Sequence, residues 1–135
     1  MADDVAKTLG QLKANAAQLK HAEARLTRSI EQIDAQLTRL GIGVRVPPEP
    51  VSKGGPQLGC RRFFDGWRLT TVITGLAELQ AETPVHEAAP EIQRELVAHV
   101  PALLTKLSTA VGARLKATQK AAGEAEKLLE AVAEV

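Results

Sequence analysis

Apolar residues recur at every third or fourth position along the first forty residues. Eleven positions follow this spacing, and Glu23 is the only charged one among them. The others are Val5, Leu9, Leu12, Ala16, Leu19, Leu26, Ile30, Ile33, Leu37 and Leu40. A repeat averaging 3.5 residues keeps one stripe of a helix facing a partner helix, which is typical of coiled coils. We therefore predict a helix over residues 2–40 that ends at Gly41 in the left-handed conformation.

The last third of the chain carries a second stripe of the same kind. Its members are Val97, Val100, Leu104, Leu107, Val111, Leu115, Thr118, Ala122, Ala125, Leu129 and Val132. Two consecutive steps of four around Val111 form a stutter, which locally unwinds a left-handed supercoil. Pro101 suits the first turn of a helix. The pattern predicts a long helix over residues 101–134, preceded by a short helix over residues 88–98.

The matching lengths of the two stripes favour an antiparallel hairpin within one chain. With Leu40 opposite Val97, Val5 meets Val132 and Glu23 meets Arg114. A polar pair in a coiled-coil seam lowers stability and can fix the register, so we expect a Glu23–Arg114 contact in the stalk. A stalk formed by residues 2–40 would be about 58 Å long at 1.5 Å per residue.

The residues beside the two stripes bear on self-association. The second helix has an additional apolar flank formed by Leu96, Leu103, Ala110, Ala121 and Leu128. A two-helix hairpin cannot cover both the stripe and this flank, so we expect the flank to bind a second copy or a partner helix. The alternative is that residues 76–100 fold back over part of it. The first helix has an uncharged flank, which argues against a parallel self-pairing zipper: Thr8, Asn15, Ala22, Ser29 and Gln36.

Residues 42–80 have the pattern of a small β-element. We expect a strand over residues 42–46, which prolines end, and a flexible loop over residues 47–58. Asp65–Gly66 is a preferred two-residue type I′ turn and lies between two β-prone runs. The resulting register places Phe64 across from Trp67 and Phe63 across from Arg68. Leu76 to Gln80 is expected to be a third strand or the start of a helix.

All aromatic residues of the chain lie at this tip. We expect Trp67 to be a core residue and Phe63 to be exposed, within reach of a cation–π contact with Arg68. The candidate partner-binding tip comprises Phe63, Arg68, Arg61 and Arg62. Basic and aromatic side chains also bind single-stranded nucleic acid. The alternative interpretation is therefore a nucleic-acid-associated protein that uses Arg45, Arg61, Arg62 and Arg68.

Overall charge does not select a partner, because 17 basic and 16 acidic residues leave a net charge of +1. Their distribution is uneven, since residues 41–75 are mainly basic and residues 76–100 are mainly acidic. The simplest interpretation is that these two segments neutralise each other across the tip.

Sequence patterns typical of catalysis or cofactor binding are not evident. The three histidines have no Cys, Asp or Glu at metal-ligand spacing. Cys60 is the only cysteine and allows no internal disulfide, and we expect a small core residue there although Arg61 and Arg62 could activate its thiol. The start lacks a signal-peptide pattern, and no run approaches the roughly 18 apolar residues of a membrane span. We expect a cytoplasmic, non-enzymatic protein that has no catalytic or metal-binding residues, binds no cofactor or small molecule, and does not contact a membrane.

The layout of two long helices joined by a β-element resembles that of prefoldin subunits. These chaperones hold clients at coiled-coil tips that project from a β-platform, so the resemblance implies a holding chaperone. A second resemblance, to small uncharacterised bacterial proteins, rests on residues 84–92 and 100–104 with Trp67 upstream, about the central third of the chain. Those proteins have Arg after the proline, where Glu91 stands here. This resemblance implies no activity.

The chain as a whole is expected to be a single α+β domain, mainly helical. It would form a long antiparallel two-helix coiled-coil hairpin capped by a small antiparallel β-sheet and a short helix. We expect a structural or adaptor protein that acts through coiled-coil self-association, as an oligomer, or through docking on a protein partner.

Overall fold

The computed structural model describes residues 1–75 and 79–135 and shows an α+β protein, as expected from the sequence. Its β-strands form one antiparallel sheet in the order β1-β2-β3-β4. In chain order, the elements are α1 (Ala2–Leu40), β1 (Val46–Pro50), β2 (Gln57–Phe63), β3 (Gly66–Thr74), β4 (Gln80–Pro84), the 3₁₀-helix η2 (Val85–Glu87), α2 (Pro90–Val97) and α3 (Val100–Ala133).

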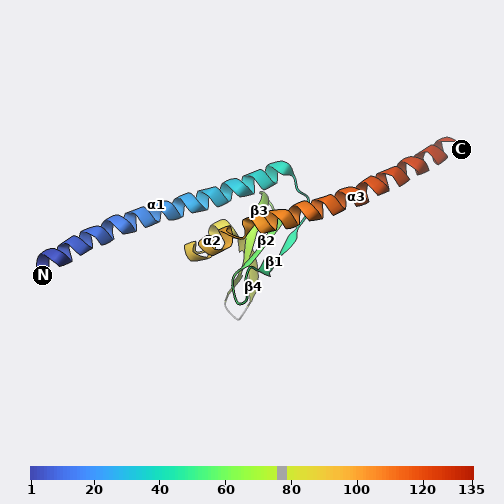
Figure 1. Ribbon diagram of the computed structural model, residues 1–135. Helices are drawn as coiled ribbons and strands as arrows, with labels where there is room; N and C mark the ends of the chain where they lie inside the picture. Colours follow the sequence, from blue (N-terminus) through green and yellow to red (C-terminus); the bar gives the residue numbers. More distant parts are fainter. Residues whose placement is uncertain (76–78) are drawn as a thin grey trace.

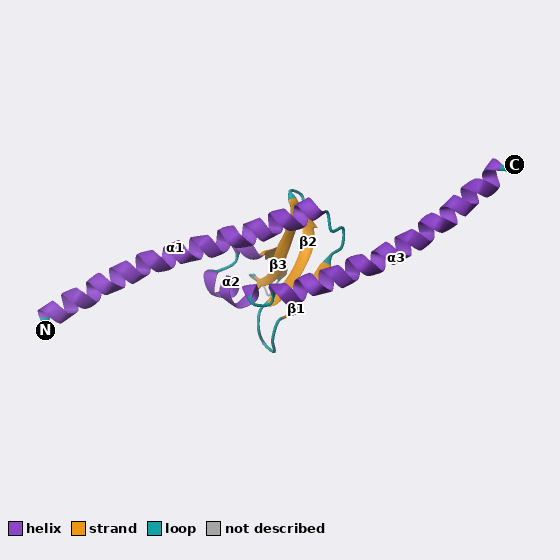
Figure 2. Ribbon diagram, turned by 45° about the horizontal axis from the view of Figure 1, so that its top comes forward, coloured by secondary structure: helices purple, strands orange, loops and turns teal. Residues whose placement is uncertain are grey.

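The two long helices cross the sheet and leave it in opposite directions. Figures 1 and 2 show the N-terminus and the C-terminus at opposite ends of an elongated molecule, with the sheet near its middle. The expected antiparallel hairpin is therefore not formed within the single chain, because α1 and α3 leave the sheet in opposite directions and the two termini lie at opposite ends. A seven-residue repeat specifies a stripe that needs cover, but it does not specify which chain supplies the cover.

Glu23 and Arg114 are separated for the same reason. Arg114 Nη1 donates a hydrogen bond to the carbonyl oxygen of Gly43, in the connection that follows α1. Glu23 lies near the middle of α1, well before the end of the helix that leads to Gly43. The expected contact between them is not formed within the chain. Gly41 ends α1 in the left-handed conformation, with φ 60°, as predicted.

The β2–β3 hairpin has a different register from the expected one. Phe63 pairs with Gly66 and Arg62 with Trp67, so the two turn residues are Phe64 and Asp65. The reason lies in Gly66, which has φ 141° and sits against α1. A Cβ atom there would lie 2.6 Å from Thr38 Oγ1. Glycine is therefore favoured here both by the close contact with the helix and by the positive φ that follows the turn.

The first strand is also displaced from its expected position. β1 begins at Val46 and contains three prolines, which were expected to end a strand. An edge strand tolerates proline because one side of its backbone has no ladder partner. Residues 47–58 consequently include most of β1 and the start of β2 rather than a loop alone. The element expected at Leu76 to Gln80 lies largely outside the described residues, and β4 begins at Gln80.

The core lies between the sheet and the inner ends of the helices. Leu58 and Cys60 of β2 and Leu69 of β3 are buried against a set of helical residues: Ile30, Leu37, Leu96, Val100, Leu103 and Leu107. Alternation along the strands sends Leu58, Cys60 and Leu69 to the face that the helices cover. The sheet thus covers the apolar stripes of α1 and α3 only where these helices cross it.

Side chains of α1 also complete the hydrogen bonding of β3. Strand β4 pairs with β3 only from Thr70 onward, so the preceding residues lack a neighbour on that side. Asp34 Oδ1 accepts a hydrogen bond from Leu69 N at 2.8 Å, and Thr38 Oγ1 accepts one from Trp67 N at 2.9 Å. These two side chains, one helical turn apart, take the place of the missing strand.

The helices of the described residues differ from typical membrane spans. No single helix is long and apolar enough to cross a membrane, and only α2 and α3 taken together, bent by 60°, meet the length and composition test.

Candidate interaction surfaces

The part of α1 that projects beyond the sheet carries an exposed apolar stripe. We call residues 2–25 the N-terminal arm. Its large stripe residues Val5, Leu9, Leu12 and Leu19 are between 54% and 61% exposed. They lie on one face because their spacing follows the heptad. Regularly spaced, exposed leucines of this kind mark an interaction face rather than isolated surface residues.

The projecting part of α3 has an equivalent stripe. We call residues 112–133 the C-terminal arm. Leu115, Leu129 and Val132 of the predicted stripe are between 55% and 71% exposed, and Leu128 of the predicted flank is 68% exposed. The C-terminal arm therefore presents a broader apolar face than the N-terminal arm does.

The sheet divides the apolar flank that was expected to form a self-interface. Leu96 and Leu103 are buried in the core, and Ala110 is half-buried. Ala121 and Leu128 are exposed on the C-terminal arm. Only these last two are available to another chain in this structure. The first two are covered within the chain, by the sheet rather than by residues 76–100 alone.

An apolar groove lies beside the start of α3, at the end of α1 that is farther from the N-terminal arm. It encloses about 360 Å³ between the end of α1 and the first turns of α3, and its lining is Leu37, Leu40, Gly41, Ile42, Leu104, Leu107, Ser108 and Val111. Leu40 and Leu104 are exposed at its rim. The groove thus extends the apolar surface next to the C-terminal arm, and the buried Ile30 separates it from the N-terminal arm.

The aromatic tip is arranged differently from the expected site. Phe64, in the turn, is fully exposed, whereas Phe63 is half-buried. The Arg61 guanidinium lies 4.9 Å from the centroid of the Phe63 ring. Arg68 Nη2 instead forms an ion pair with Asp65 Oδ2 at 2.8 Å. The expected Phe63–Arg68 contact is replaced by these two, because Arg68 pairs across the strands with Arg61.

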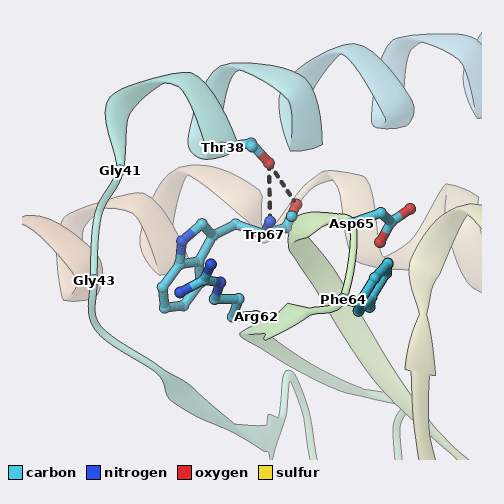
Figure 3. A pocket seen from close by; sticks show the side chains of 8 residues that line it. Thr38, Gly41, Gly43, Arg62, Phe64, Asp65 and Trp67 are labelled. Carbon is cyan, nitrogen blue, oxygen red and sulfur yellow. Dashed lines mark hydrogen bonds between the residues drawn. The ribbon is translucent and has the colours of Figure 1, made fainter.

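Arg62 and Trp67 occupy the opposite side of the same hairpin (Figure 3). They are cross-strand partners and line an open cavity of about 400 Å³ with Thr38, Gly41 and Phe64. Trp67 is half-buried against the core, as expected, and its backbone is held by Thr38. Sequence reasoning missed Phe64 as the exposed aromatic because Asp65–Gly66 is the commoner turn dipeptide.

The basic residues of the tip are largely paired. Glu82 of β4 lies within 3.3 Å of Arg45 and 3.8 Å of Arg61, and its side chain is almost buried. Arg68 is paired with Asp65. The contacts of Glu82 match the neutralisation that the basic and acidic segments predict, whereas the Arg68–Asp65 pair lies within the basic segment. Arg62 makes no ion pair with any described residue, so one cation of the predicted tip is left to solvent.

A buried polar group lies beneath the hairpin. Asp34 is completely buried, with Oδ2 at 3.6 Å from His86 Nδ1. Burial raises the pKa of Asp34 to about 6, although the hydrogen bond from Leu69 and the charge of Arg68 oppose the shift. Burial and then the charges of Asp34 and Glu82 raise the pKa of Cys60 to about 12. This thiol is therefore held protonated despite its basic neighbours, and it packs as a small apolar residue.

Comparisons with known proteins give no assignment. No protein-family model matches the chain, and neither a curated protein nor a solved structure matches it.

Proposed function

We propose that the protein is a non-enzymatic structural module that acts through its helical arms by coiled-coil self-association. The observation that carries this proposal is the exposed stripe of Val5, Leu9, Leu12 and Leu19. Helices of this length derive most of their stability from packing an apolar face. Burying each leucine contributes about 1.5–3 kcal/mol, so association of the arms has a substantial driving force.

The surface between the arms supports the same proposal. The groove at Leu40 and Leu104 adds apolar surface beside the start of the C-terminal arm. A surface that extends along both helices suits a partner that is itself a long helix. Docking on the helix of a different protein is the other way to cover it.

The nucleic-acid alternative receives less support. Arg45, Arg61 and Arg68 already have acidic partners, and a phosphate would have to displace them. Arg62 beside Trp67 remains as one cation next to one aromatic ring. Affinity for a phosphate backbone normally depends on several such cations.

Lysines introduced into the stripe test the proposal. We expect Leu9→Lys combined with Leu19→Lys to convert an associated wild-type protein into monomers, because charge in the seam opposes burial. The matched control is Gln11→Lys combined with Gln18→Lys, which adds the same charge to the same arm away from the stripe. Sedimentation velocity and helical circular dichroism should be measured for all three. Equal association of the stripe variant and the control would overturn the proposal.

A further inference from the structure

We propose that the arms pair between two copies: the N-terminal arm of one chain packs antiparallel against the C-terminal arm of the other. A symmetric dimer then contains two such pairs, one at each end. This inference rests on the proposed function and specifies its partner as a second copy of this chain.

The direction of the helices leads to this arrangement. α1 and α3 run the same way across the sheet, and their arms leave at opposite ends (Figures 1 and 2). A twofold axis through the middle of the molecule, perpendicular to the helices, reverses the second copy. The reversed N-terminal arm then lies beside the first copy's C-terminal arm, antiparallel to it. Such an interface is closed, so it produces a dimer rather than a filament.

The two arms match in length. At 1.5 Å per residue, residues 2–25 span about 36 Å and residues 112–133 span about 33 Å. With a contact strip about 10 Å wide on each helix, the four arms bury on the order of 1,300 Å² in total. That area falls within the range of stable specific interfaces, roughly 1,200–2,000 Å². The groove at Leu40 and Leu104 lies near the axis and adds to it.

The flanks of the arms are complementary in this orientation. In an antiparallel pair, residues at equivalent flank positions of the heptad face each other. The uncharged flank of the N-terminal arm, which includes Thr8 and Asn15, then faces the apolar flank at Leu128 and Ala121. A parallel pair of N-terminal arms would instead leave the C-terminal arm uncovered.

Charges on the other side of the seam agree with the same orientation. Lys13 flanks the N-terminal stripe on the side that faces Glu126. Glu23, the charged residue within the stripe, falls level with Arg114 of the second chain. Arg114 bonds the Gly43 carbonyl through one of its five N–H donors, so others remain for Glu23. The pair expected from the sequence is thus satisfied between chains rather than within one.

Distances between labelled sites test the pairing without depending on its exact register. Lys7→Cys and Glu130→Cys place labels on the outer faces of the two arms, and the unsubstituted chain, whose Cys60 is buried, is the labelling control. We expect a spin-label distance below about 30 Å when Lys7→Cys and Glu130→Cys chains are mixed, since paired helices lie 8–10 Å apart and both labels point outward from helices 10–12 Å wide. Two Lys7→Cys chains should show a distance above about 70 Å, because the arms extend from opposite ends.

The other possible outcomes distinguish failure of the antiparallel pairing from failure of self-association. A dimer with closely spaced Lys7→Cys labels would mean parallel N-terminal arms, and this would overturn the antiparallel pairing while keeping self-association. A dimer in which every label distance is long would place the interface away from the arms and also overturn the pairing. A monomer at all concentrations would overturn self-association itself.

Discussion

Asp34 accepts a hydrogen bond from the backbone N–H of Leu69 at 2.8 Å, and this bond ties the long helix α1 to the middle of the sheet. The carboxylate is completely buried and serves a strand segment that β4 does not reach. Thr38 does the same for Trp67 one turn later. The direction in which the N-terminal arm leaves the sheet therefore depends on polar contacts as well as on apolar packing.

Removal of the Asp34 carboxylate should destabilise the fold. We expect Asp34→Ala to lower the free energy of unfolding by about 1–3 kcal/mol, because Leu69 N–H is left buried without an acceptor. Asp34→Asn keeps an amide oxygen at the same position and should cost much less at neutral pH. Urea denaturation followed by circular dichroism measures both. Equal losses in the two variants would contradict a role for this hydrogen bond.

The raised pKa of Asp34 predicts a pH dependence of stability. The pKa is about 6 in the folded protein and about 3.8 when unperturbed, so the folded state binds the proton more tightly. The ionised carboxylate therefore costs stability at pH 7, and the protein should become more stable as the pH falls through 6 toward 4. The full effect is on the order of 3 kcal/mol.

The charges of Arg68, His86 and Glu31 also shift the pKa of Asp34. Asp34→Asn keeps these neighbours and removes only the titrating carboxyl, so comparison with this variant isolates the contribution of Asp34. The difference in unfolding free energy between wild type and Asp34→Asn should shift toward the wild type by most of that amount between pH 7 and pH 4. A difference that stays constant over this range would show that Asp34 does not titrate near pH 6.

Gly66 should tolerate no side chain. We expect Gly66→Ala to lower the free energy of unfolding by about 1–3 kcal/mol, because the new Cβ meets Thr38 Oγ1 at 2.6 Å and the backbone has φ 141°. Gly54→Ala is the control, since Gly54 also has a positive φ but has open space around it. Thermal unfolding of both variants should show the larger loss at Gly66. A larger loss at Gly54 would contradict the importance of the helix contact.

Cys60 should be unreactive in the folded protein. Its thiol is completely buried, and its pKa is raised to about 12, so almost no thiolate exists at pH 8. A thiol reagent such as dithionitrobenzoate should modify it only after the chain is unfolded in denaturant. Rapid stoichiometric modification of the native protein would contradict the burial of this strand.

The sequence predicted the long helices because heptad spacing and Gly41 are local signals. It did not predict which way the helices face each other, since the same stripe can be covered within a chain or by a second copy. The hairpin register was not predicted because it depends on the close contact between Gly66 and Thr38, which is distant in sequence. Asp34 gave no signal at all, because its role depends on the point at which β4 stops pairing with β3.

Solution mass measured by light scattering over a range of concentrations tests self-association of the arms most directly. We predict a dimer of about 29 kDa, twice the 14.4 kDa chain, whose mass is unchanged by Arg61→Ala and Arg62→Ala but falls with Leu9→Lys and Leu19→Lys. A mass of 14.4 kDa at every concentration would contradict the account.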